Sequence, residues 1–106
     1  NFLKNMTDII EAHFSDSNLS VDFLTEQMGI SRSSLYNKIK VLTDKTPNEL
    51  IQLMRLKKAA QLLRENKYRI NEICYMVGFN NPSYFSKCFY KQFGMKPGEF
   101  AAQSGE

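Results

Sequence analysis

Residues 70–93, INEICYMVGFNNPSYFSKCFYKQF, contain the pattern that decides the fold. Apolar residues recur at helical spacing on both sides of a short polar segment, which predicts two amphipathic helices separated by a tight turn. Gly78 can adopt the positive φ angle that ends a helix. Asn81 is a favourable N-cap, and Pro82 suits the first position of the helix that follows. The stretch therefore predicts a helix-turn-helix.

The same pattern occurs earlier in the chain. Gly29 precedes Gly78 by 49 residues, and after one extra residue in the later turn Pro47 precedes Pro97 by 50. The matched apolar and acidic pairs are Val21 with Ile70, Leu24 with Ile73, Met28 with Val77, Ile30 with Phe79, Leu35 with Phe85, Ile39 with Phe89, Glu49 with Glu99 and Leu50 with Phe100. An internal repeat in one register predicts a second helix-turn-helix at about residues 20–42.

The remaining segments also have a helical period. Thr46, Pro47 and Glu49 predict the start of a long helix over residues 47–66. Its apolar stripe is too wide for one contact surface, which indicates a helix that joins two bodies. We expect an all-α fold of about seven helices, with two homeodomain-like helix-turn-helix units in tandem joined by this linker helix. The expected divisions are residues 1–46, 47–66 and 67–106.

Charge and cysteine content narrow the functional classes. Residues 1–30 carry one lysine and five acidic residues, whereas residues 31–106 carry thirteen lysines and arginines against six acidic residues. A basic body of this kind suits a polyanion such as nucleic acid. Two cysteines do not make a disulfide framework, so a reducing, cytoplasmic setting is expected. No apolar run reaches the ~20 residues of a membrane helix, so no membrane contact is expected of this domain.

The second helix of each repeat has one face turned away from its apolar stripe. With Leu35 at zero and 100° per residue, Ile39 and Leu42 fall toward the core. Applying the same phase from Phe85 to the second helix of the later repeat gives an equivalent outward face. The candidate base-reading residues on the two outward faces and their flanks are Ser33, Tyr36, Asn37, Lys40, Ser83, Ser86 and Lys87. Asparagine can pair with adenine and lysine with guanine in the major groove, and serine with either base.

Phosphate contacts are expected around these faces. The second helix of each repeat is here called the recognition helix. Its first turn presents free backbone N–H groups, which favour the binding of an anion. The candidate phosphate-binding residues are Ser31, Arg32, Lys38, Lys45, Asn81, Tyr90, Lys91 and Lys96. A linker helix of about 20 residues is ~30 Å long, close to the ~34 Å between major-groove segments on one side of B-DNA. One chain is therefore expected to place two recognition helices in adjacent major-groove segments.

Three stretches carry a resemblance to a known family. They are SRSSLYNKIK at residues 31–40, RLKKAAQLL at 55–63 and INEICYMVGFNNPSYFSKCFYKQFGMKPGEF at 70–100. Over about residues 19–100 the chain resembles the AraC/XylS family of bacterial transcription regulators. The resemblance implies a two-lobed DNA-binding domain that activates transcription from promoter DNA and contacts RNA polymerase. It also implies base-reading positions at Ser33, Tyr36, Asn37, Ser83, Ser86 and Lys87.

The amino-acid sequence of the first and third stretches also resembles the output domain of hybrid two-component regulators. That resemblance implies upstream sensor or dimerisation domains and a cytoplasmic domain whose parent protein can be membrane-anchored. The chain departs from the family pattern at Cys74, where Ala is usual, at Lys96, where Ser or Thr is usual, and at Asp44, where Gly is frequent.

Two other functional classes make different predictions for this sequence. A helical protein-interaction module without DNA binding predicts apolar anchors on the outward faces, where Ser, Asn and Lys dominate instead. An enzyme is not expected, because no nucleophile–base pair, metal-ligand spacing or Gly-rich phosphate loop is present, and neither a cofactor nor a metal is implied. His13, the only histidine, is expected to be a packing or capping residue. Arg55 is expected either to hold the lobes together or to contact phosphate.

Overall fold

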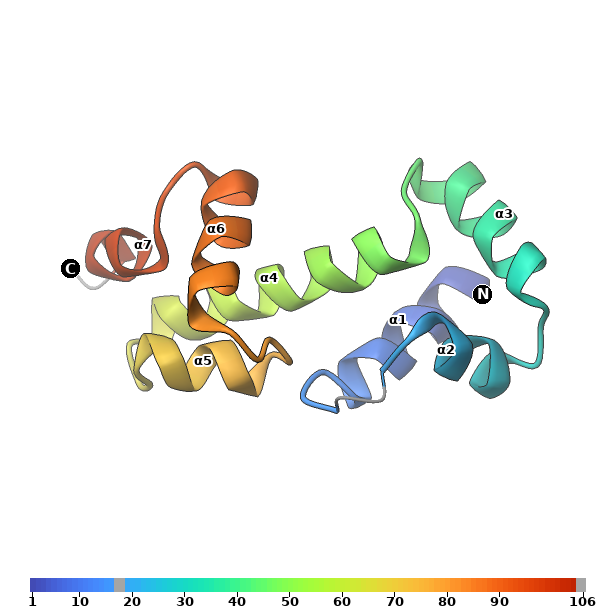
Figure 1. Ribbon diagram of the computed structural model, residues 1–106, viewed down its shortest axis with the longest axis horizontal. Coiled ribbons are helices and arrows are strands. Elements are labelled where there is room, and N and C mark those ends of the chain that lie inside the picture. The colour runs from blue at the N-terminus through green and yellow to red at the C-terminus, as the bar shows by residue number, and fades with distance from the viewer. Residues whose placement is uncertain (17–18, 105–106) are drawn as a thin grey trace. The chain divides into compact units, whose positions relative to one another are not determined.

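The computed structural model describes residues 1–16 and 19–104, which form seven helices and no strand (Figure 1). The all-α prediction is therefore confirmed for the described residues. The helices are α1 (Phe2–Ala12), α2 (Val21–Met28), α3 (Arg32–Thr43), α4 (Pro47–Glu65), α5 (Ile70–Met76), α6 (Pro82–Phe93) and α7 (Pro97–Ser104). No helix in the described part of the chain combines the length and apolar character needed to span a bilayer.

The chain divides into two compact units, here called unit 1 (Asn1–Met54) and unit 2 (Arg55–Glu106). The division falls inside α4, so this helix contributes side chains to two separate cores. Leu50 and Ile51 belong to the core of unit 1. The α4 side of the core of unit 2 consists of Leu56, Ala59, Ala60, Leu62 and Leu63. The unusually wide apolar stripe of α4 is explained by this double burial.

Unit 1 is built from α1, α2, α3 and the first turns of α4. Asn1, Ser20 and Ser31 cap α1, α2 and α3, each accepting hydrogen bonds from backbone N–H groups of the following turn. The fully buried side chains of this core are Met6, Ile10, Leu24, Leu35 and Ile39. His13 donates from Nδ1 to the carbonyl oxygen of Ile9, 2.8 Å away, and its ring packs edge-on against Phe23. The expected structural role of His13 is thereby confirmed.

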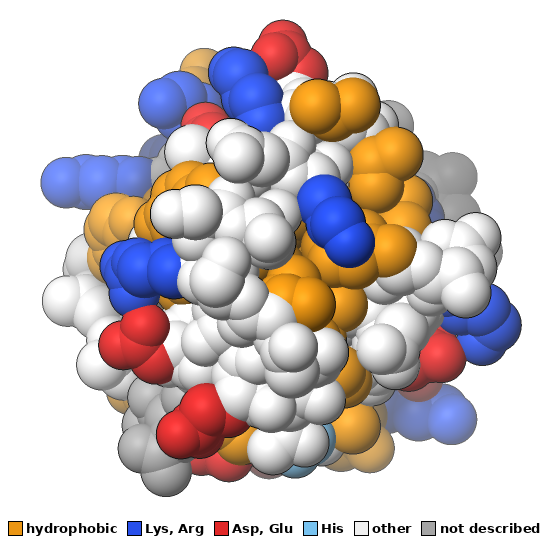
Figure 2. Space-filling view, turned by 90° about the vertical axis from the view of Figure 1, so that its right-hand side faces the viewer, with side chains coloured by type: hydrophobic (Ala, Val, Ile, Leu, Met, Phe, Trp, Pro, Cys, Tyr) orange, Lys and Arg blue, Asp and Glu red, His pale blue; other side chains and the backbone are white. Residues whose placement is uncertain are grey.

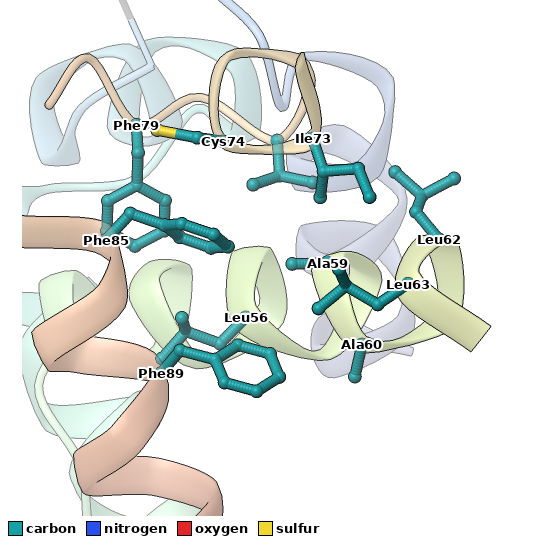
Figure 3. Close-up of a cluster of buried hydrophobic side chains, with 11 residues drawn as sticks. Leu56, Ala59, Ala60, Leu62, Leu63, Ile73, Cys74, Phe79, Phe85 and Phe89 are labelled. Atoms are coloured by element: carbon teal, nitrogen blue, oxygen red, sulfur yellow. The ribbon is translucent and has the colours of Figure 1, made fainter. Parts of the chain in front are cut away.

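Unit 2 is organised around phenylalanines of α6 (Figure 3). Phe85 and Phe89 are fully buried, and the ring of Phe89 lies 4.6 Å from that of Phe93 and 5.4 Å from that of Phe100, centroid to centroid. These rings join α6 to α7 and pack with α4 and α5. Cys74 is fully buried in the same cluster, as expected for a small apolar side chain.

The helix-turn-helix of unit 1 is formed by α2 and α3, and that of unit 2 by α5 and α6. Gly29 ends α2 with φ +66°, and Gly78 follows α5 with φ +101°, so both adopt the left-handed conformation that the sequence required of them. Asp44 ends α3 in the same conformation, with φ +59°, at the position that Gly94 occupies after α6. An aspartate tolerates this conformation better than most residues that carry a Cβ atom.

One predicted core position is wrong. Leu42 falls on the inward side of an ideal helical wheel, but its side chain is 54% exposed. Leu35 and Ile39 do belong to the core. Leu42 lies in the last turn of α3, two residues before Asp44 ends the helix. The core of unit 1 contains no side chain from this turn, so the periodicity of the helix continues beyond the surface that it packs against.

The start of α4 leads to a pH-dependent prediction. The backbone N–H of Thr46 donates to Glu49 Oε1 at 2.9 Å, and the N–H of Glu49 donates to Thr46 Oγ1 at 3.2 Å, which is a capping box. The backbone hydrogen bond from Thr46 lowers the pKa of Glu49 below its ordinary value of 4.5. Because the pKa is lower in the folded chain, ionised Glu49 stabilises the fold above pH 4.5, and this contribution is lost as pH falls through the folded-state pKa.

We therefore expect Glu49→Gln to lower the melting temperature at pH 7, and we expect this difference from the wild-type chain to shrink as pH falls below 4.5. Glutamine keeps a hydrogen-bond acceptor but carries no charge to favour the helix amino end. Thermal unfolding followed by circular dichroism across this pH range measures the difference between the two proteins. A difference that stays constant with pH would contradict the role of the ionised carboxylate.

Candidate nucleic-acid interface

Helix α3 presents small polar and cationic side chains opposite its buried stripe. Ser31 starts the helix, its Oγ accepting the N–H of Ser34 at 3.1 Å. Leu35 and Ile39 fix the rotation of the helix by burying one face. Ser33, Asn37, Lys38 and Lys40 are exposed, and Tyr36 is half-buried on the flank. The exposed side of α3 is thus a row of hydrogen-bonding groups held on a rigid element.

Several cations of α3 already have partners. Arg32 forms an ion pair with Asp22, and its guanidinium lies 5.8 Å from the centre of the Tyr36 ring. Lys40 Nζ lies 3.0 Å from Asp44 Oδ1. All four charged side chains are more than half exposed, and such pairs contribute little to stability. A phosphate can therefore replace either carboxylate at small cost.

Helix α6 repeats this arrangement in unit 2. The side-chain oxygen of Asn81 accepts the N–H of Tyr84 at 3.1 Å, and Pro82 occupies the first turn, as predicted. With Phe85 and Phe89 buried, Ser83, Lys87, Tyr90 and Lys91 are exposed and Ser86 is half-buried. Lys91 also lies in the last turn of α6, where a cation complements the carboxyl end of the helix dipole.

Unit 2 brings base-reading and phosphate-binding candidates together. Ser86, Lys87, Tyr90 and Lys96 line one hollow of about 350 Å³ on the outward side of α6. Lys96 comes from the turn before α7, and its backbone N–H is held by Glu99 Oε1 at 3.0 Å. The residue of unit 1 that corresponds to Lys96 is Thr46. Lys45, one residue earlier, is half-buried, and its backbone N–H donates to Thr43 Oγ1.

Unit 1 has a different hollow, which sequence reasoning missed. Phe2, Asn37, Lys38, Val41 and Leu42 line a space of about 340 Å³. Val41 is 84% exposed. Its position on the helical wheel, 240° from Leu35 and 40° from Asn37, would have placed it on the outward face. The contribution of Phe2 from α1 had no signal in the local sequence.

The titratable side chains of Arg55, Tyr84 and Cys74 have pKa values that are shifted by their surroundings. Burial lowers the pKa of Arg55 in α4, and its Nε atom is buried without a hydrogen-bond partner in the described part of the chain. A hydrogen bond with Cys88 raises the pKa of Tyr84 on α6, and burial raises the pKa of the Cys74 thiol. Within residues 1–16 and 19–104, no three His, Cys, Asp or Glu side chains group in a way that could hold a metal ion.

Comparison with known proteins assigns the chain to a family. A helix-turn-helix domain family matches residues 24–103. Histidine kinase P4 of Formosa agariphila is 45% identical over 104 residues, which are 98% of this chain and 8% of that protein. The HTH-type transcriptional activator RhaS of Shigella boydii is 32% identical over 88 residues, which are 83% of this chain and 31% of that protein. The chain thus spans less than a third of either curated relative.

A solved structure extends the likeness to the fold. A transcriptional regulator from Chromobacterium violaceum, described as one of the AraC-type DNA-binding domain-containing proteins, has a TM-score of 0.91 and 28% identity. The match covers 98% of this chain and 92% of that one. The family match at residues 24–103 covers α3 to α6 in full and α2 from Leu24 onward. The chain belongs to the AraC-type helix-turn-helix DNA-binding domain family.

Proposed function

We propose that this chain binds promoter DNA sequence-specifically as the DNA-binding domain of a bacterial transcription regulator. The main support is the equivalence of the two outward faces. Ser33 and Asn37 are exposed on α3, and Ser83 and Lys87 are exposed at the corresponding positions of α6. Side chains of these types read base edges in the major groove. Core packing does not require serine, asparagine or lysine at these sites, because the buried stripe lies on the opposite side of each helix.

In this proposal each recognition helix occupies one major-groove segment. Ser33, Tyr36, Asn37 and Lys40 read one half of the site, and Ser83, Ser86 and Lys87 read the other. Phosphates are bound by the amino ends of the two helices, at Ser31 and Asn81. They are also bound by side chains that flank the outward faces, namely Arg32, Lys38, Lys45, Tyr90, Lys91 and Lys96. Selection of bound sites from random duplexes tests the arrangement: two short motifs about one helical turn apart are expected, and a single motif would contradict it.

Salt dependence is the direct test of the proposed function. Five cations are assigned to phosphates, namely Arg32, Lys38, Lys45, Lys91 and Lys96. Because each neutralised phosphate releases counterions, affinity should fall about 500-fold between 50 and 200 mM salt. Fluorescence anisotropy with a labelled duplex measures this slope. Lys96→Ala should reduce the logarithmic slope by about one, whereas Lys57→Ala, exposed on α4 outside the interface, should leave it unchanged. Affinity independent of salt would contradict DNA binding.

The parent protein and its partners belong to the same proposal. Support for an activator comes from the likeness to RhaS, and support for a two-component regulator with upstream sensor domains comes from the likeness to Histidine kinase P4. In that setting the domain acts in the cytoplasm, within a parent protein that can be anchored in the membrane, and contacts RNA polymerase. Transcription in vitro from a promoter bearing the selected site should increase with the regulator. An unchanged transcript level would contradict activation while leaving DNA binding intact.

One observation favours the alternative of a protein-interaction module. Val41 and Leu42 are exposed apolar side chains on α3, and such anchors were the signature expected of that class. At the equivalent positions of α6, 50 residues later, the chain has Lys91 and Gln92. The apolar pair therefore occurs on only one of the two recognition helices. A protein-interaction module would not explain why both units carry matched polar faces. DNA binding accounts for both faces.

A further inference from the structure

An apolar strip borders the polar row of α3. Ser33, Asn37 and Val41 succeed one another at intervals of four residues, so they form one line along the exposed side of the helix. Figure 2, which views the chain from the side where α3 lies in Figure 1, shows hydrophobic side chains gathered beside lysines and arginines. Val41 is 84% exposed, more than any other large hydrophobic side chain among the described residues.

Packing inside unit 1 does not explain this strip. The core includes Leu35 and Ile39 but neither Val41 nor Leu42. A single exposed apolar side chain is common on protein surfaces and needs no explanation. Here two adjacent ones share a hollow with Phe2 from α1, so the apolar surface is contiguous and lies next to a candidate base-reading residue.

The hollow combines three kinds of chemistry. Val41, Leu42 and Phe2 supply an apolar wall, Asn37 supplies an amide, and Lys38 supplies a cation. Lys38 Nζ lies 5.1 Å from the centre of the Phe2 ring, which holds the ammonium at the rim. An amide able to pair with adenine, an apolar surface and a cation are the groups needed to contact an A·T pair, a thymine methyl and a backbone phosphate.

We propose that Val41 is a specificity-determining residue that contacts the 5-methyl group of a thymine, with Leu42 behind it. This inference rests on the proposed DNA-binding function. Val41 lies four positions after Asn37 along the helix, a rise of about 6 Å. Base pairs are stacked about 3.4 Å apart. The thymine read by Val41 therefore lies one to two base pairs from the base read by Asn37, with Lys38 on a neighbouring phosphate.

The second unit provides an internal comparison. Lys91 stands at the position of α6 that corresponds to Val41, and Gln92 stands at that of Leu42. Both are polar and exposed. Apolar recognition of a thymine methyl is therefore confined to the half of the site that α3 binds, which makes the two halves respond differently to removal of methyl groups.

Replacing thymines by deoxyuridine in a selected duplex, one at a time, tests the proposal, because this change removes only the methyl group. In the half bound by α3, one thymine should be sensitive, with about fourfold weaker binding. Val41→Ala should weaken binding to the thymine duplex and abolish the difference between thymine and deoxyuridine. Lys91→Ala should lower affinity for both duplexes and preserve their ratio. Because Val41 is exposed, circular dichroism should confirm an unchanged fold in Val41→Ala.

Two results would overturn the proposal. One is an α3 half-site that tolerates deoxyuridine at every position. The other is a Val41→Ala variant that keeps the sensitivity of the wild-type chain. Either result, obtained with salt-dependent DNA binding intact, leaves the proposed function standing and shows that the strip is not a thymine contact. Failure of the wild-type chain to bind any duplex at low salt would instead contradict the proposed function itself.

Discussion

Replacing Phe89 by alanine is expected to unfold most of unit 2 while unit 1 keeps its helices. The Phe89 side chain is fully buried, and its ring contacts those of Phe85, Phe93 and Phe100. Truncating a buried phenylalanine costs about 3–5 kcal/mol. A unit of about fifty residues has a stability of roughly 3–8 kcal/mol, so the loss is comparable with all of it. The two units have separate cores, which limits the damage to one.

Intrinsic tyrosine fluorescence during urea unfolding can follow this effect. Four of the five tyrosines, Tyr68, Tyr75, Tyr84 and Tyr90, lie in unit 2, and Tyr36 lies in unit 1. The variant should show the unfolded tyrosine signal with partial loss of helicity by circular dichroism. Gln92→Ala, exposed on the same helix, should change stability by no more than about 0.5 kcal/mol. An unfolding midpoint of Phe89→Ala equal to that of Gln92→Ala would contradict the packing assigned to this core.

Asn37→Ala and Lys87→Ala are expected to weaken binding to a selected site by about 1–3 kcal/mol each. The two side chains are exposed at equivalent positions of α3 and α6, so neither change should affect folding. Each variant should lose its discrimination only in its own half of the site, because a base contact reports the identity of one base pair. The losses should be nearly additive, since the residues lie in separate units with no shared partner.

Binding curves on duplexes mutated in one half at a time distinguish these variants. Lys96→Ala serves as the comparison, because a phosphate contact should weaken binding about equally on all sequences. If Asn37→Ala and Lys87→Ala also lose the same amount on every duplex, their contacts are to the backbone. Lys87 is the more informative of the two, since it shares a hollow with Lys96 and Tyr90, both assigned to phosphates.

Much of the fold was predictable from local patterns. Helix starts followed from Asn81 and the Thr46–Glu49 box, which form the expected hydrogen bonds. The repeat at 49–50 residues predicts both helix-turn-helix elements from the sequence alone. These signals are reliable because a cap or an amphipathic period depends on residues within one or two turns of each other.

The error at Leu42 has its cause in the tertiary structure. A helical wheel assumes that the core extends along the whole helix, whereas the packing partners of α3 reach Ile39 and not the final turn. A side chain on the inward side of a helical wheel is buried only where another segment packs against it. That information is carried by the other helices of the core, among them α1, whose Met6 and Ile10 are distant from α3 in the sequence.

The sequence by itself predicted about seven helices, the caps at Asn81 and Thr46, the duplication and the polar residues that face away from each core. Only the tertiary structure decided which of these residues share a surface: Phe2 with Lys38 and Val41 in unit 1, and Lys96 with Ser86 and Tyr90 in unit 2. The physical reason is that periodicity and capping are local, whereas each hollow is formed by segments that meet only after the apolar stripes of several helices have been buried together.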